Sequence, residues 1–66
     1  MLFKKLRTGQ EFSVPNVPNV EGLTFMKICA DDTPINAVVM SGSTHVFCKG
    51  VTAIVTDERE VDLIEK

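Results

Sequence analysis

The side chains in this sequence that could bind a metal ion are two cysteines and the single histidine. Cys29 lies in one apolar run, and His45 and Cys48 lie close together in another. With Asp31 or Asp32 as a further ligand, they would suit a tetrahedral Zn²⁺ site. Residues i and i+3 of a strand, however, point to opposite faces. We therefore expect no metal, keep this set as the alternative, and expect both thiols to be buried or half-buried small hydrophobic groups.

Catalysis by these residues is not expected either. A hydrolytic nucleophile needs a base and an orienting group within reach, and His45 and Cys48 face opposite ways if their segment is a strand. Asp31 and Asp32 are adjacent in a turn, where carboxylates are normally solvated. The sequence has no G-x-S-x-G elbow. We expect a protein that is not an enzyme and has no cofactor.

The size and composition are those of a small folded domain. With 66 residues, we expect a single domain spanning residues 1–66. No stretch approaches the roughly 18 apolar residues of a membrane span. The basic start lacks the apolar region of a secretory signal. We therefore expect a cytoplasmic protein without membrane association, and reduced thiols.

Apolar runs separated by turn residues predict the elements that must position any site. The runs cover residues 23–30, 35–40 and 44–49, with Asp-Asp-Thr-Pro after the first and a tight Ser-Gly-Ser hairpin at 41–43 after the second. Such runs are typical of a β-meander. Two further strands are expected, at 11–14 with Phe12 and Val14 on one face, and at 51–56.

The 23–30 run is apolar in both strand phases. Leu23 and Phe25 favour one face and Met26 the other, while Lys27 is expected to face the solvent. A strand that is apolar on both faces is central in a barrel or covered by a neighbour. A bend near Phe25-Met26 would reconcile the two phases. The pattern favours a closed barrel over an open, one-faced sheet.

Residues 15–20 form a tandem Pro-Asn-Val tripeptide. Each proline removes a ladder donor and favours extended backbone before it, so we expect a polyproline-like loop closed by Glu21-Gly22. A stiff loop suits a partner-binding surface, and the alternative is a duplication tolerated on the surface. The predicted partner-binding residues are Pro15, Asn16, Val17, Pro18, Asn19 and Val20.

The two ends of the chain carry opposite charges, although the net charge is only −2. Residues 1–7 contain three cations and no acid, whereas residues 57–66 contain five acids and two cations. The ends could pair within one molecule or between two. The simpler expectation is that both are solvated, because surface ion pairs contribute little. We expect a core over residues 6–56, a helical turn or extended lead-in at 2–6, and an extended or strand-like acidic tail.

One series of motifs runs through the chain. It starts with L-x-x-G-x-x-F at Leu6, Gly9 and Phe12, continues with F-M-K-I, A-V-V-M and a glycine hairpin at Gly42, and ends with V-x-x-I-V. This series resembles small SH3-like β-barrel proteins of bacteriophages and bacteria. The resemblance implies an all-β fold, a small five-stranded antiparallel meander forming an SH3-like barrel, with residues 15–20 in its long first loop. Trp and Tyr are absent, so binding of proline-rich peptides is not implied.

From these patterns we expect a protein-interaction or assembly module. The resemblance implies a phage-encoded protein, either a virion accessory or one that binds a host protein, located in the virion or host cytoplasm. Exposed sheet edges suit pairing with a protein partner or with a second copy in a homodimer. The alternative is a nucleic-acid-binding barrel, which the acidic net charge disfavours. Its cations would be Lys4, Lys5, Arg7, Lys27 and Lys49, with Phe3 or Phe25 stacking on bases.

Overall fold

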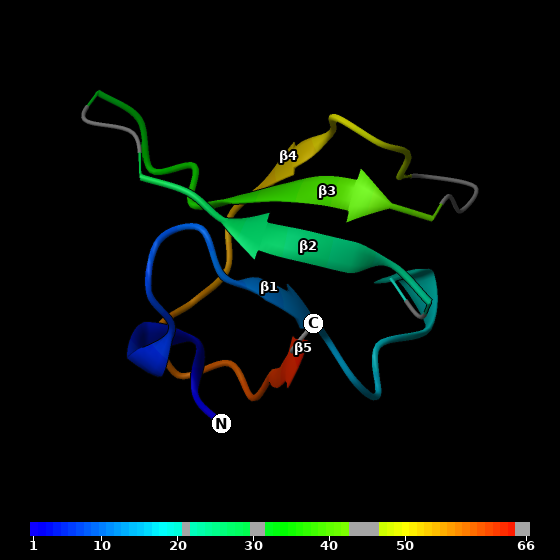
Figure 1. The fold of residues 1–66 in the computed structure, drawn as a ribbon, viewed down its shortest axis with the longest axis horizontal. Coiled ribbons are helices and arrows are strands. Elements are labelled where there is room, and N and C mark those ends of the chain that lie inside the picture. The colour runs from blue at the N-terminus through cyan, green and yellow to red at the C-terminus, as the bar shows by residue number, and fades with distance from the viewer. Residues whose placement is uncertain (21, 30–31, 43–46, 65–66) are drawn as a thin grey trace.

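A computed structural model describes residues 1–20, 22–29, 32–42 and 47–64 of the chain. These residues form an all-β fold with a five-stranded antiparallel sheet of order β4-β3-β2-β1-β5 (Figure 1). The strands are β1 (Glu11–Ser13), β2 (Thr24–Lys27), β3 (Ala37–Ser41), β4 (Thr52–Ala53) and β5 (Asp62–Ile64), and the 3₁₀ helices are η1 (Phe3–Lys5) and η2 (Pro18–Val20). The all-β and five-strand predictions are confirmed. Because β4 and β5 are both edges, the sheet is open.

The inner face of the sheet is organised around Phe12. This residue pairs with Phe25 of β2 and with Leu63 of β5, and Phe25 pairs in turn with Val39 of β3. The Phe12 ring stacks on Phe25 at 5.5 Å between centroids and meets the edge of Phe3 at 5.3 Å. The buried apolar residues are Phe3, Leu6, Phe12, Val14, Leu23, Phe25, Ala37, Val39 and Val61. The predicted inward face of Phe12 and Val14 is thus confirmed.

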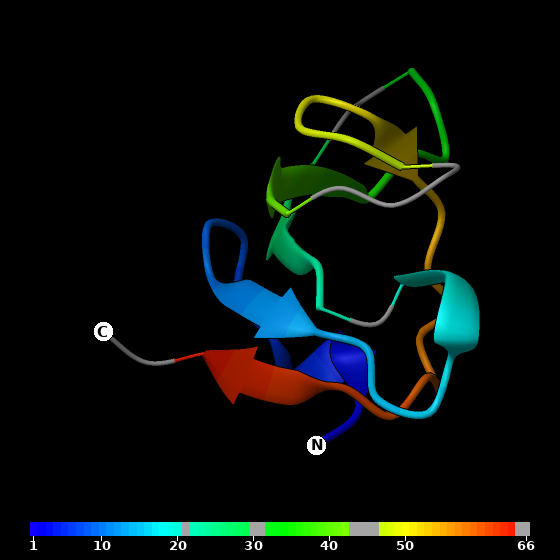
Figure 2. The ribbon, with the colours of Figure 1, turned by 90° about the vertical axis from the view of Figure 1, so that its right-hand side faces the viewer.

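The core extends beyond the expected 6–56 range at both ends. Phe3 and Val61 are 1% and 0% exposed. The two ends of the chain lie side by side (Figure 2), since the Phe3 N–H donates to the Arg59 carbonyl at 2.9 Å and the Val61 N–H to the Met1 carbonyl at 2.8 Å. The tail is strand-like as predicted, but it is part of the core. The reason is that β5 pairs with β1 on the edge opposite β2 and thereby helps to cover Phe12.

The fourth strand comes later in the chain than predicted. Ala37 of β3 pairs with Ala53 of β4, so residues from the predicted last run, 51–56, lie beside β3. Residues 47–49 of the predicted 44–49 strand are not in a strand, and the rest of that prediction lies outside the described residues. In the described part of the chain, the strand that follows β3 is β4, which begins at Thr52. The runs at 44–49 and 51–56 are both apolar, so their periodicity alone does not show which of them pairs with β3.

Lys27 faces the inner side of the sheet, and the prediction that it faces solvent is wrong. It shares a face with Phe25 two residues earlier. Its Nζ donates to the carbonyls of Phe3 at 3.2 Å and Leu6 at 2.8 Å, and lies 4.6 Å from the centroid of the Phe3 ring. The ammonium thus adds a second donor to the Phe3 carbonyl, which already accepts from the Leu6 N–H, and supplies a donor to the Leu6 carbonyl at the end of η1. The register shift in this strand lies between Thr24 and Phe25, one residue before the predicted bend.

Candidate partner-binding site

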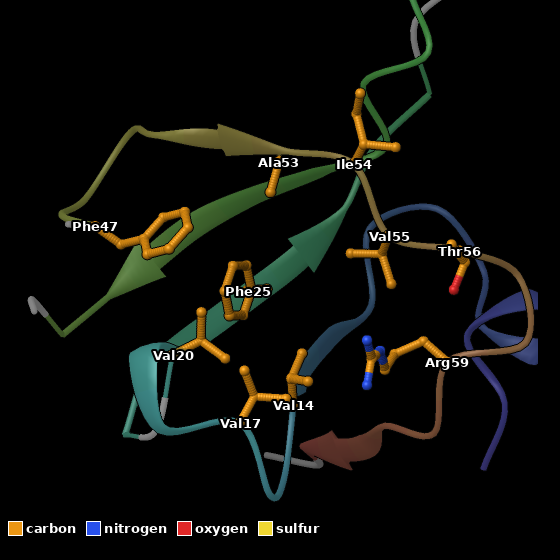
Figure 3. A pocket seen from close by; sticks show the side chains of 10 residues that line it. All are labelled: Val14, Val17, Val20, Phe25, Phe47, Ala53, Ile54, Val55, Thr56 and Arg59. Atoms are coloured by element: carbon orange, nitrogen blue, oxygen red, sulfur yellow. The ribbon is translucent and has the colours of Figure 1, made fainter.

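An apolar hollow of about 200 Å³ opens between the segment of residues 17–20 and the chain at 53–56 (Figure 3). Phe25, from the middle of the sheet, lies between these two walls. Of the described lining residues, Thr56 and Arg59 contribute polar side-chain groups. The described residues that line the hollow are Val14, Val17, Val20, Phe25, Phe47, Ala53, Ile54, Val55, Thr56 and Arg59.

The first wall comes from the Pro-Asn-Val repeat, which is not extended throughout as predicted. Its second copy is the 3₁₀ helix η2, closed by a hydrogen bond of 3.1 Å from the Val20 N–H to the Val17 carbonyl. Residues i and i+3 of such a turn lie on the same side, so Val17 and Val20 both reach the hollow. The turn begins at Asn16, which has a φ of 63°. Asparagine accepts this left-handed conformation more readily than most residues.

The other predicted partner-binding residues lie around this wall. Pro15 is half-buried, and Asn16 and Pro18 are exposed. The side chain of Asn19 is outside the described part of the structure. Of the six predicted residues, the hollow therefore receives two.

A close contact fixes the loop that carries this wall. Gly42, with a φ of 86°, lies where an added Cβ would come within 2.9 Å of the Gly22 carbonyl oxygen and 3.1 Å of Leu23 Cδ2. Only glycine allows the backbone to approach so closely with this φ. The end of β3 thus holds the end of the 17–22 loop in place.

The second wall is the alternating segment that follows Gly50. Val51, Ala53 and Val55 are half-buried, whereas the residues between them are exposed. The Asn36 side chain holds this wall to the sheet: its Nδ2 donates to the Val55 carbonyl and its Oδ1 accepts from the Val55 N–H, both at 2.7 Å. This pair of bonds continues the β3–β4 contact past the end of the ladder.

Ile54 is the exposed member of this wall, with 63% of its surface accessible. Its two sequence neighbours, Ala53 and Val55, use their main-chain groups toward Asn36. The main-chain groups of Ile54 make no backbone hydrogen bond to any residue that the structure describes. With respect to the residues that the structure describes, the wall is therefore also an unpaired sheet edge.

Arg59 lies at one end of the hollow, and Figure 3 shows its guanidinium directed inward beside Val14 and Val55. Within the described residues, this guanidinium has no hydrogen bond or ion pair. The glutamates on either side of Arg59 in the sequence, in contrast, each form an ion pair. Glu58 accepts an ion pair from Lys4 Nζ at 3.1 Å, and Glu60 accepts one from the terminal ammonium at 3.2 Å.

The cations of the nucleic-acid alternative are not gathered on one surface. The Lys27 ammonium is bonded to two carbonyls and Lys4 is paired with Glu58. Lys49 belongs to the turn before β4, at the opposite end of the molecule from η1 (Figures 1 and 2). The remaining members, Lys5 and Arg7, are exposed near η1.

The aromatic residues of that alternative are not placed for stacking on bases. Phe3 and Phe25 are 1% and 2% exposed. Both rings contact Phe12 in the core. This part of the prediction is wrong, because a chain with four phenylalanines and no other aromatic residue uses these rings to fill its interior.

The expected burial of the thiols is also wrong, since Cys29 and Cys48 are both exposed. Each lies in a connecting segment. Cys29 follows β2, and Cys48 belongs to a turn in which its own carbonyl accepts a hydrogen bond from the Val51 N–H at 3.1 Å. Asp32 is exposed as well, and His45 and Asp31 lie outside the described residues. The residues that the structure describes contain no cluster of metal-binding side chains.

Ile54, Phe47 and Arg59 are among the lining residues that no site prediction included. Ile54 lies in the predicted 51–56 strand, and Phe47 lies in the predicted 44–49 strand. Arg59 was treated as part of a solvated tail. The described helices include none long and apolar enough to cross a membrane. No protein-family model, no curated protein and no solved structure matches this chain.

Proposed function

We propose that this chain is a non-catalytic protein-interaction module that receives an apolar side chain of a protein partner in the hollow. The observation that carries this proposal is an open hollow with valine and phenylalanine walls next to an exposed isoleucine, Ile54. Burying such surface stabilises a complex by about 25 cal/mol per Å². A chain this small has little apolar surface beyond its core needs, so this exposed set favours a binding role.

The size and chemistry of the hollow support a side chain as its occupant. Small-molecule sites usually measure roughly 300–1,000 Å³, and this hollow measures about 200 Å³. Among the described residues, no carboxylate, imidazole or thiol lines it, so this part of the lining offers no general base or nucleophile. A receiving site for a partner side chain needs neither.

The proposed kinship with small SH3-like barrels rests on the sequence motifs together with the five antiparallel strands and the long loop after β1. In this proposal the hollow occupies the opening between that first loop and the fourth strand. A phage-encoded virion accessory or host-binding protein would use such a module for docking.

A selection from displayed random linear peptides tests the proposal, with the protein held at a concentration at which sedimentation shows a monomer. We expect the wild-type chain to enrich peptides with bulky apolar residues. Ile54→Asp should weaken their binding at least about tenfold, because a carboxylate at the rim is desolvated on binding. Thr52→Asp, which adds the same charge two residues earlier in the same segment and outside the lining, is the matched control.

The proposal is contradicted if no peptide is enriched, or if the two variants bind the enriched peptides equally well. Circular dichroism melts of both variants show whether each remains folded. A peptide that binds at another surface would be insensitive to Ile54→Asp.

A further inference from the structure

Among the described residues, the hollow lies beside a strand edge without a partner strand and beside Arg59, a cation without an ion pair. Together, these features indicate what kind of partner segment would fit the hollow. Resting on the proposed function, we propose that the partner contributes an extended segment that pairs with the edge at Ile54, inserts an apolar side chain into the hollow and places a carboxylate on Arg59. Ile54 and Arg59 both line the hollow that would receive the side chain (Figure 3).

The edge argument follows from the direction of the hydrogen bonds at β4. The Ala53 carbonyl accepts from the Asn36 N–H at 3.2 Å, and Val55 is bonded to the Asn36 side chain. In a strand, the main-chain groups of alternate residues point to opposite edges, so those of Ile54 point away from β3. An unpaired edge of this kind is a template for strand addition, in which main-chain bonds give affinity and side-chain pockets give selectivity.

The charge argument rests on Arg59. A guanidinium offers a fork of donors that matches a carboxylate, and here it is directed into an otherwise apolar site. The carboxylates of Glu58 and Glu60 are already paired with cations of the N-terminal segment. Of the acids at 57–60, Asp57 is then the one without an ion pair in the described chain. The site therefore presents a positive charge although the whole molecule is acidic.

Strand geometry restricts the sequence of the partner segment. Side chains of an added strand alternate between two faces. The apolar side chain in the hollow and the carboxylate on Arg59 must leave the strand on the same face. They are therefore separated by an even number of positions, with the carboxylate belonging to Asp, Glu or the chain end.

The test uses the most enriched displayed peptide, synthesised and titrated against the full chain. Arg59→Gln should weaken its binding about ten- to hundredfold, the usual range for loss of a charge-assisted hydrogen bond. Arg7→Gln, at the other exposed arginine, should leave binding unchanged. Arg59→Glu should bind a peptide in which lysine replaces the acid better than it binds the original peptide.

Strand addition is tested separately, by amide hydrogen exchange of the protein and by N-methylation of the peptide. The amide of Ile54 should exchange rapidly with solvent in the free protein and slowly in the complex. N-methylation of the peptide should abolish binding at alternate positions and leave binding intact at the positions between them.

The outcomes separate this inference from the proposed function. Peptides that depend on Ile54 but carry no acid and ignore Arg59→Gln would overturn the carboxylate assignment and leave the interaction module standing. Binding without protection of the Ile54 amide would overturn strand addition. Enrichment of no peptide overturns both proposals, and dimerisation of the free chain through Ile54 at assay concentration would assign the edge to a second copy instead.

Discussion

The two halves of this molecule differ in how completely they cover their apolar side chains. The closed half comprises η1, β1 and β5, in which Phe3, Phe12 and Val61 are 1%, 0% and 0% exposed. The open half comprises residues 17–20 and 47–56, whose valine and phenylalanine side chains are half-buried and whose Ile54 is exposed. The apolar side chains near the β5 edge of the sheet are thus fully covered, whereas those near the β4 edge remain partly accessible to solvent.

The difference shows how a short chain can divide its residues between stability and binding. The closed half joins segments from both ends of the chain around stacked and edge-on phenylalanine rings. The open half is held to the rest of the sheet by backbone hydrogen bonds between β3 and residues 50–53, by the Asn36 side chain, and by the close approach of Gly42 to Gly22. We therefore expect substitutions in the closed half to affect the whole fold, and those in the open half to act locally.

The largest effect is expected for Phe12→Ala. Removing a fully buried phenylalanine costs about 3–5 kcal/mol, and the stability of a chain of this length is itself only about 3–10 kcal/mol at the usual value per residue. Most molecules should be unfolded or close to it in urea titrations followed by circular dichroism. Phe47→Ala, in the open half, is the control and should cost less than about 1.5 kcal/mol. Equal costs for the two would remove the distinction between the halves.

A smaller loss is expected for Lys27→Met, which keeps the aliphatic stem and removes the ammonium. The Phe3 and Leu6 carbonyls would lose a charged donor, at a cost of about 2–3 kcal/mol. Lys5→Met, at an exposed lysine of the same region, should change the free energy of unfolding by less than about 0.5 kcal/mol. If Lys27→Met proved as mild as this control, the inward ammonium would not stabilise the closed half.

The smallest of the three effects is expected for Asn36→Asp in the open half. The change replaces the Nδ2 donor by an acceptor facing the Val55 carbonyl, which costs about 1–2 kcal/mol. Hydrogen exchange of the Val55 amide should accelerate, while that of the Leu6 amide, bonded to Phe3 at 3.0 Å, should not change. Asn16→Asp, at an exposed site, serves as control. Acceleration at Leu6 as well would mean that the halves unfold together.

The sequence predicted those features of the fold that depend on neighbouring residues. The β-formers of the central runs predicted an all-β chain. The alternation at 11–14 predicted that Phe12 and Val14 share a face, and both are buried. The Pro-Asn-Val repeat indicated the loop that supplies Val17 and Val20 to the hollow. Local patterns were sufficient for these because strand and turn preferences act over a few residues.

The candidate site could be predicted only in part, because its other members come from distant segments. Phe47 and Ile54 belong to runs that both look like strands, and only pairing with β3 distinguishes them. The cysteines were expected to be buried but are exposed, because both lie in connecting segments and not in strands. Arg59 lines the hollow because its segment is tied to η1 through the Phe3 N–H.

By itself, then, the sequence determined the strand-rich character of the chain, its approximate turns and the inward face of its first strand. The tertiary structure decided which run lies beside β3, that the tail joins β1, and that Lys27 turns inward to the carbonyls of η1. These are choices among segments of similar composition. They are settled by the apolar surface and hydrogen bonds that the whole chain can satisfy at once, and no local pattern contains that information.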